Sequence, residues 1–170
     1  MRVFSRLSVC SVVFGIIGAA YTVFIGGADD VFHVAENINY SQNIVLSYII
    51  FHLKTVFLIF FNGLCSFGWI TVFPILFFRS YYMSFTCISI AVANMKEATV
   101  LVPPLLLSFI LEIGSLIFFT PIAAEFALSI VKIQNISFGK RFFDYFLLFI
   151  LSTIFSCLSA LCNLIFQGYI

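Results

Sequence analysis

Charge is the property that this sequence has least of. Asp, Glu, Lys and Arg together make up 9% of its 170 residues, whereas a soluble domain carries about 25% because its surface must be hydrated. The eight basic and seven acidic residues leave a net charge of +1, which gives little attraction to the phosphates of a nucleic acid. The scarcity of charge therefore argues against a soluble domain and against a nucleic-acid partner.

The motifs of common catalytic and metal sites are also missing. The sequence contains no HExxH, GxSxG or Walker A pattern, which would place a metal, a nucleophile or a phosphate-binding loop. Its histidines, His33 and His52, are too few and too far apart to form a metal site by themselves. The five cysteines form no CxxC pair and lie in apolar runs, where cysteine acts as a small hydrophobic residue. We therefore expect a non-enzymatic protein without a cofactor or a metal.

What the sequence has instead is apolar length. Hydrophobic residues make up 63% of the chain, including 24 Phe, and the mean hydropathy is +1.19. A helix crosses the hydrocarbon core of a bilayer with about 20 apolar residues. We predict an all-α, polytopic transmembrane helix bundle that forms a single integral membrane domain over residues 1–170, surrounded by membrane lipid. The predicted spans, about five, cover residues 7–27, 55–78, 81–95, 98–131 and 142–166, with an interfacial segment at 29–52.

Three of these segments leave an alternative open. A signal peptide is the alternative interpretation of the first apolar run, although the run is long for one and no A-x-A cleavage site ends it. The polar stretch 29–43 fits a solvated loop as well as a helix lying on the membrane. The run 81–95 covers only about 22 Å as a helix, so it either crosses obliquely or re-enters.

Prolines predict where the helices bend. Pro74 should kink the second span, because proline removes a helical hydrogen bond. The fourth segment would be about 51 Å long as one helix, which is too long for one crossing. Pro103, Pro104 and Pro121 offer break points within it. We therefore expect a broken or hairpin-like fourth segment.

The distribution of basic residues predicts an orientation. With five crossings and the N-terminus in the cytoplasm, the C-terminus lies outside. Six basic residues then lie inside and two outside, which is the bias expected of cytoplasmic loops. The inside set is Arg2, Arg6, Arg79, Lys132, Lys140 and Arg141, and the outside set is Lys54 and Lys96.

Ionisable residues within apolar segments are the candidate functional groups. An acidic residue at mid-membrane costs about 2.5–3.5 kcal/mol on insertion scales, so Glu112 and Glu125 need a partner or a proton. Glu112 fits a proton relay, an ion site or a partner contact as well as it fits a packing role, and for Glu125 we favour a packing role. Lys54 is expected to extend to the outer interface, and Asn62 to hydrogen-bond between helices.

Small residues mark two candidate helix contacts. Gly15 and Gly18 lie on one side of the first span, and Gly63 and Gly68 flank Ser66 in the second. Such residues let helix backbones approach closely. They are compatible with packing inside the chain and leave a homo-oligomer open.

The middle of the chain resembles the stage II sporulation protein M family of bacterial integral membrane proteins. The resemblance covers roughly residues 45 to 166. It is carried by the run Leu53 to Gly63, by Phe67-Gly68 and Pro74, by Phe77 to Thr86, and by Glu112-Ile113. Ser80 and Ser84 stand where the family has glycines. The family's P-Q-N or P-H-G element and the acidic residue of its last helix are absent, which weakens any function tied to them.

The resemblance implies a multi-pass protein of the bacterial cytoplasmic membrane. For spore formers, the resemblance implies a non-enzymatic scaffold that assembles with the stage II sporulation proteins D and P. Those two proteins degrade peptidoglycan during engulfment. Our first hypothesis is therefore a scaffold that recruits cell-wall hydrolases or other membrane and envelope proteins. The alternative is a small transporter or permease subunit with Glu112 in its pathway.

Overall fold

The computed structural model describes residues 2–26, 44–93, 95–131 and 138–167. Over these residues the chain forms five helices and a short turn, which confirms the predicted all-α helical bundle. The helices are α1 (Arg2–Gly26), α3 (Ile44–Gly63), α4 (Gly68–Ala93), α5 (Met95–Val131) and α6 (Phe138–Gln167).

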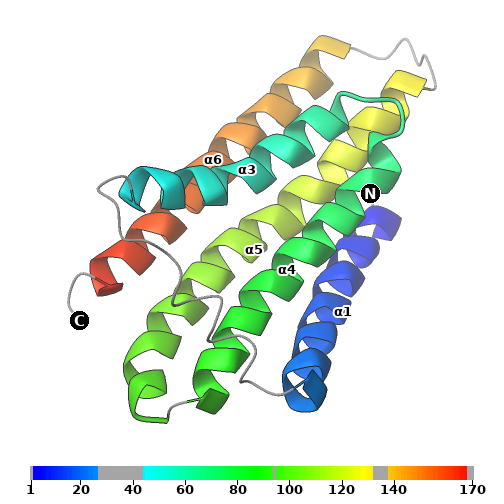
Figure 1. The fold of residues 1–170 in the computed structure, drawn as a ribbon. Helices are drawn as coiled ribbons and strands as arrows, with labels where there is room; N and C mark the ends of the chain where they lie inside the picture. The colour runs from blue at the N-terminus through cyan, green and yellow to red at the C-terminus, as the bar shows by residue number, and fades with distance from the viewer. Residues whose placement is uncertain (1, 27–43, 94, 132–137, 168–170) are drawn as a thin grey trace.

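The helices form a bundle in which the order of packing differs from the order along the chain (Figure 1). The helices α1, α4, α5 and α6 lie in that order, each against the next, and α3 packs across α6, α4 and α5. The start of α1, the turn between α3 and α4, the end of α5 and the start of α6 meet at one end of the bundle. We call this the first end of the bundle.

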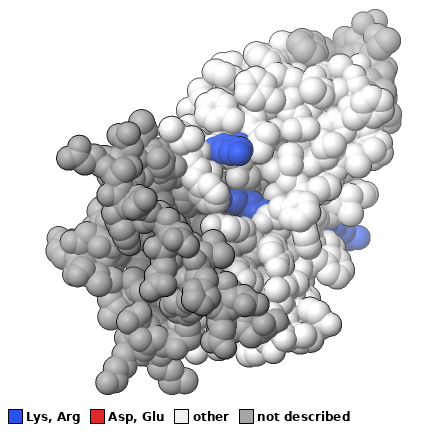
Figure 2. Space-filling view, in the orientation of Figure 1, with Lys and Arg blue, Asp and Glu red and all other residues white. Residues whose placement is uncertain are grey.

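Four of the described helices are long and apolar enough to cross a membrane. These stretches are Arg2–Ile25, Gly68–Val92, Val102–Ile130 and Gly139–Cys162. The apolar part of α3, Ile49–Gly63, is shorter than these four. Large apolar side chains such as Phe14, Phe24 and Phe118 point outward, and the face seen in Figure 2 carries only isolated patches of Lys or Arg. A surface of this kind suits lipid and is typical of a multi-pass membrane protein.

The second and third predicted spans have their boundary in the wrong place. The chain turns at residues 64–67, where Leu64 N–H donates to Phe61 O over 3.2 Å and Gly68 N–H donates to Cys65 O over 2.9 Å. A side chain at Gly68 would overlap the Asn62 carbonyl, so this tight turn requires glycine. The expected end at Arg79 is wrong because α4 continues through it to Ala93, and 81–95 is therefore no separate segment.

The fourth segment is neither broken nor a hairpin. Helix α5 runs without interruption from Met95 to Val131 with Pro103, Pro104 and Pro121 inside it, and Pro74 lies inside α4. Prolines are tolerated in membrane helices because neighbouring groups satisfy the backbone carbonyls that they leave without a donor. The bends expected at these prolines stay a prediction.

The interfacial segment expected at 29–52 is only partly within the described structure. Residues 29–43 lie outside the described residues, and residues 44–52 form the first half of α3 rather than a segment of their own. His52 lies there among the buried residues of the bundle. Apolar character continuous with Ile49–Gly63 explains why this stretch joins the helix.

Two of the expected packing glycines lie directly against another helix. A side chain at Gly15 would overlap the Ser80 hydroxyl of α4, and one at Gly63 would overlap the Tyr145 hydroxyl of α6. Gly18 leaves ordinary contact distance, 3.5 Å, to the Tyr81 ring. Gly15 and Gly63 therefore allow the close approach of α1 to α4 and of α3 to α6.

Aromatic stacking holds α3, α5 and α6 together near the first end. Tyr145 is fully buried between the rings of Phe60 and Phe126, with centroid distances of 5.1 and 4.7 Å. Its hydroxyl donates a hydrogen bond of 2.5 Å to the Phe60 carbonyl. Phe119 of α5 stacks on the same tyrosine at 5.5 Å. This cluster fixes one end of α3 and leaves its middle to be held by a second, polar contact.

A buried ionic cluster as the candidate functional site

The turn between α3 and α4 brings two basic residues to one level. His52 lies eleven residues before Gly63, where α3 ends, and Arg79 lies eleven residues after Gly68, where α4 begins. In an antiparallel helix pair, positions equally far from the turn lie side by side. At about 1.5 Å per residue, both lie about 16 Å from the turn, which is about half the length of the 20-residue helix α3.

Glu112 of α5 completes the cluster with both basic residues. Arg79 Nε donates to Glu112 Oε1 over 2.7 Å and Arg79 Nη2 donates to Oε2 over 2.9 Å, which is a two-pronged pairing. His52 Nδ1 lies 2.5 Å from Glu112 Oε2. The exposed fractions are 0% for Glu112, 2% for His52 and 6% for Arg79. We call these three residues the ionic cluster.

The hydrogen-bond geometry favours one arrangement of protons. An ionised Glu112 only accepts hydrogen bonds, so the short contact requires a proton on His52 Nδ1. Arg79 Nη2 lies 3.1 Å from the same nitrogen, and the two nitrogens then share Glu112 Oε2 as their acceptor. The charges of Arg79 and Glu112 offset each other within the cluster, which is a condition for burying an ion pair in a low-dielectric interior.

Phe51 covers the cluster on its outer side. Its ring lies under the guanidinium group of Arg79, whose Cζ is 4.5 Å from the ring centroid. The same ring meets the His52 ring edge-on at 6.0 Å and the Tyr82 ring at 5.5 Å. Phe51 itself is exposed. It therefore separates the charges from the surroundings and adds a cation–π contact to Arg79.

The other polar candidates lie outside the ionic cluster. Asn62 spans the turn, because its Oδ1 accepts from Thr71 Oγ1 over 2.7 Å and its Nδ2 donates to the Leu58 carbonyl over 2.8 Å. Glu125 is half-buried on the same unbroken helix as Glu112, thirteen residues further on, so the structure does not bring the two carboxyl groups together.

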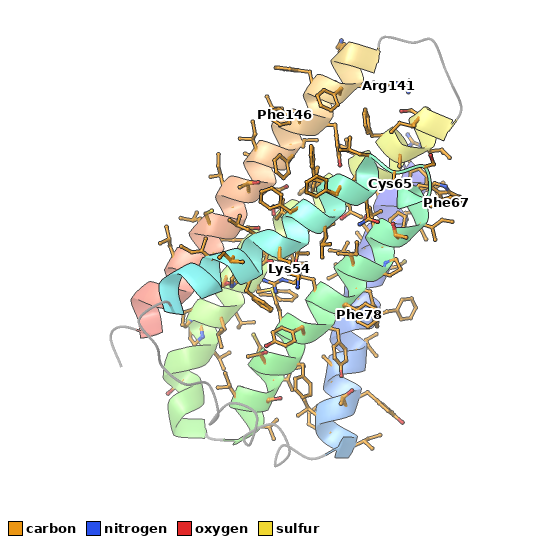
Figure 3. The ribbon with its side chains drawn as sticks, turned by 45° about the horizontal axis from the view of Figure 1, so that its top comes forward. Lys54, Cys65, Phe67, Phe78, Arg141 and Phe146 are labelled. Atoms are coloured by element: carbon orange, nitrogen blue, oxygen red, sulfur yellow. The ribbon has the colours of Figure 1, made fainter. Side chains whose placement is uncertain are left out.

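Lys54 differs from Asn62 and Glu125 in its exposure. Its side chain is exposed on α3, near the middle of the bundle's length (Figure 3). It forms no ion pair with any residue in the described part of the chain. It is therefore a cation in the middle of α3 that the described helices leave without a countercharge.

Sequence reasoning identified Glu112 but missed its two partners. His52 and Arg79 read as residues at a membrane boundary, because charged groups usually mark one. The signal that could have found them is the equal spacing of the two residues from the Gly63 and Gly68 pair. That spacing has meaning only once the turn is placed between the two glycines rather than at Arg79.

Within the described residues, no group of three His, Cys, Asp or Glu side chains is arranged to hold a metal ion. The cluster instead joins three helices through charge-assisted hydrogen bonds. The family resemblance rests on the residues quoted for it alone: no protein-family model, no curated protein and no solved structure matches this chain.

Proposed function

We propose that this chain is a non-enzymatic membrane scaffold, and that the middle of α3 binds a membrane helix of a partner protein. The observation that carries the proposal is the exposed Lys54, which lies among apolar side chains without a countercharge in the described structure. The partner helix is expected to carry an Asp or Glu at the depth of Lys54. The ionic cluster keeps α3 in place for this contact.

The energetic argument starts from the position of Lys54. It is the eleventh of the twenty residues of α3, so it is about equally far from both helix ends. A lysine at the centre of a membrane helix costs about 2.5–3.5 kcal/mol on insertion scales, and such residues almost always pair with another group. An acidic side chain on a partner helix would remove this cost and would give the contact its specificity.

The surroundings of Lys54 suit a helix as the partner. Phe51, Lys54, Leu58 and Phe61 are all exposed, and their spacing of three, four and three residues places them along one face of α3. This is the spacing with which one helix packs along another. We call these four residues the α3 seam. A partner would bury three apolar side chains around one charge, Phe51 before Lys54 and Leu58 and Phe61 after it.

The orientation of the scaffold follows from the ends of the bundle. The described residues Arg2, Arg6, Lys140 and Arg141 are exposed, and they lie at the starts of α1 and α6, which meet at the first end. By the positive-inside rule this end is cytoplasmic. When α3 is counted as a crossing beside the four longer helices, the chain crosses five times and its C-terminus lies outside. Localisation to a bacterial cytoplasmic membrane, and peptidoglycan-degrading proteins as partners, are the proposals that the family resemblance adds.

Site-specific photocrosslinking in intact cells tests the scaffold. A benzoylphenylalanine placed at Leu58 should crosslink to a discrete membrane protein, whereas one placed at Phe14, which is also exposed but lies on α1, should not. Lys54→Leu should abolish the Leu58 product and Lys54→Arg should retain it. An identical product in the Lys54→Leu variant, or none in the wild type, would overturn the proposal.

A second candidate function is proton-coupled transport. It is favoured by the direct contact of His52 with Glu112, because both side chains can hold a proton at mid-depth. The two functions differ in purified protein. A scaffold reconstituted in liposomes should pass no more protons under a pH gradient than protein-free vesicles. A flux that His52→Gln or Glu112→Gln removes, with Lys54→Leu retaining it, would replace the scaffold by the transporter.

A further inference from the structure

An apolar groove of about 690 Å³ opens between α1, α5 and α6. Its walls include Pro121 of α5 and Leu151 and Phe155 of α6, and Arg2 and Ser5 of α1 line it as well. Neither α3 nor α4 contributes a lining residue. The groove is therefore separate from the ionic cluster and from the α3 seam.

The groove combines an apolar floor with a cation at the end of the bundle. Arg2 is exposed and begins α1, at the first end, where Arg6, Lys140 and Arg141 are also exposed. The described acidic residues on the same part of the bundle are Asp144, which is exposed, and Glu125, which is half-buried. Basic residues therefore outnumber acidic ones at the level where lipid headgroups would lie.

We propose that this groove binds one acyl chain of an anionic phospholipid, whose phosphate pairs with the Arg2 guanidinium group. A guanidinium group can donate two parallel hydrogen bonds to a phosphate, and the Ser5 hydroxyl supplies a further donor. Basic pockets between membrane helices are a recurring site for anionic headgroups. The apolar walls take the chain, so the two ends of the ligand meet matching chemistry.

The length of the groove favours an acyl chain over a partner helix. Its lining runs from Ser115 to Ile122 on α5 and from Leu148 to Phe155 on α6. Each stretch rises about 10 Å, which is roughly a third of the hydrocarbon core. A membrane helix lying against the bundle would need contact over more of that depth, whereas the upper part of one acyl chain matches it.

Photolabelling of the wild-type protein tests the site directly. The full chain is reconstituted in phosphatidylcholine vesicles with a trace of phosphatidylglycerol that carries a diazirine in one acyl chain. Labels should concentrate on peptides containing residues 115–122 and 148–155, rather than on the exposed part of α1 that lies outside the groove, at Phe14 and Phe24. Phosphatidylcholine with the same diazirine should label these peptides about fivefold less, which is the effect expected of one basic residue at an anionic surface. Labels spread evenly over all exposed helix faces would overturn the proposal.

Matched variants then assign the headgroup. Arg2→Gln should remove the preference for phosphatidylglycerol, whereas Arg6→Gln, which removes the same charge from the same helix outside the groove, should leave most of it. Equal losses in both variants would mean diffuse attraction and would overturn the site. Leu151→Trp should reduce labelling by both lipids, with its thermal unfolding compared to the wild type to show that it folds.

A partner helix in the groove gives a different result. Native mass spectrometry of the protein in mild detergent counts bound lipids and subunits together. One retained anionic lipid per chain supports the proposal. A dimer that gains lipid only when it dissociates would place a second copy of the chain in the groove instead, and would overturn it.

Discussion

Two cations at about the same level of the bundle, Arg79 and Lys54, have opposite environments. Arg79 is buried, paired through two hydrogen bonds with Glu112 and covered by the ring of Phe51. Lys54 lies about 14 Å from the same turn, yet it is exposed and pairs with no acidic side chain among the residues described. One charge is therefore used to hold the chain together, and the other is left for something outside it.

The chemistry of the two side chains matches these different uses. The guanidinium group of Arg79 is planar, always charged and weakly hydrated, so it suits a buried, two-pronged pairing with Glu112. The ammonium group of Lys54 sits on a flexible stem of four carbons that can follow a moving or incoming partner. If the two residues have these roles, substitutions around Arg79 should change folding, and substitutions of Lys54 should change association.

The largest effect is expected from removing the countercharge of Arg79. Glu112→Leu leaves a guanidinium group buried without a partner, which typically destabilises a protein by about 3–5 kcal/mol. The variant should lose most of its monodisperse yield in mild detergent and unfold at a much lower denaturant concentration. Unfolding in mixed micelles, followed by far-ultraviolet circular dichroism, measures the change.

A double variant shows whether the charge or the packing is responsible. In Glu112→Leu combined with Arg79→Met, both charges are absent and similar volume remains. Replacing a whole buried ion pair by apolar residues is often close to neutral, so the double variant should recover most of the stability. If it is as unstable as Glu112→Leu alone, the pairing with Arg79 is not what the single substitution broke.

A smaller effect is expected at His52. Its substitution by Leu removes one hydrogen bond to Glu112 but leaves the two from Arg79. A hydrogen bond to a charged group contributes about 1.5–3 kcal/mol, so His52→Leu should destabilise the bundle less than Glu112→Leu. The same unfolding assay ranks them, and equal losses would contradict the subordinate place of His52 in the cluster.

The contact of Phe51 with Arg79 should be smaller again. Phe51→Leu keeps apolar cover over the cluster and removes the cation–π contact, which contributes about 0.5–1 kcal/mol at an exposed site. Phe57→Leu is the matched control. Phe57 is exposed on the same helix, and its ring contacts Phe61 and Phe149 rather than Arg79. If the two variants unfold alike, the ring adds nothing specific to the arginine.

The helical bundle could be predicted from the sequence, but the position of the turn between α3 and α4 could not. Apolar length alone determines that these segments are helices in lipid. Residues 44–78 form one long apolar stretch, however, and nothing in hydropathy separates its two helices. The turn depends on the backbone of Gly68 approaching the Asn62 carbonyl, which is a steric property that periodicity does not record.

The misplaced turn is also the reason why two of the three residues of the ionic cluster were not predicted. Glu112 was identifiable, because an isolated carboxyl group in an apolar helix demands a partner. Arg79 was placed at the membrane surface, since a single charge in sequence gives no sign that a carboxylate more than thirty residues away neutralises it. The prolines of α5 led to a different wrong prediction, a break in a helix that is in fact continuous. Neighbouring helices stabilise a helix that its own sequence would break.

The smallest effect on stability is expected at Lys54, and it is the most informative. Lys54→Leu removes an exposed side chain without a countercharge in the described structure, so the free energy of unfolding should change by no more than about 0.5 kcal/mol, as for most surface substitutions. Association should nevertheless be lost, because a partner's carboxyl group would then face leucine. The two measurements on one variant separate the roles of the two cations. A loss of stability comparable to that of Glu112→Leu would show that Lys54, like Arg79, serves the fold.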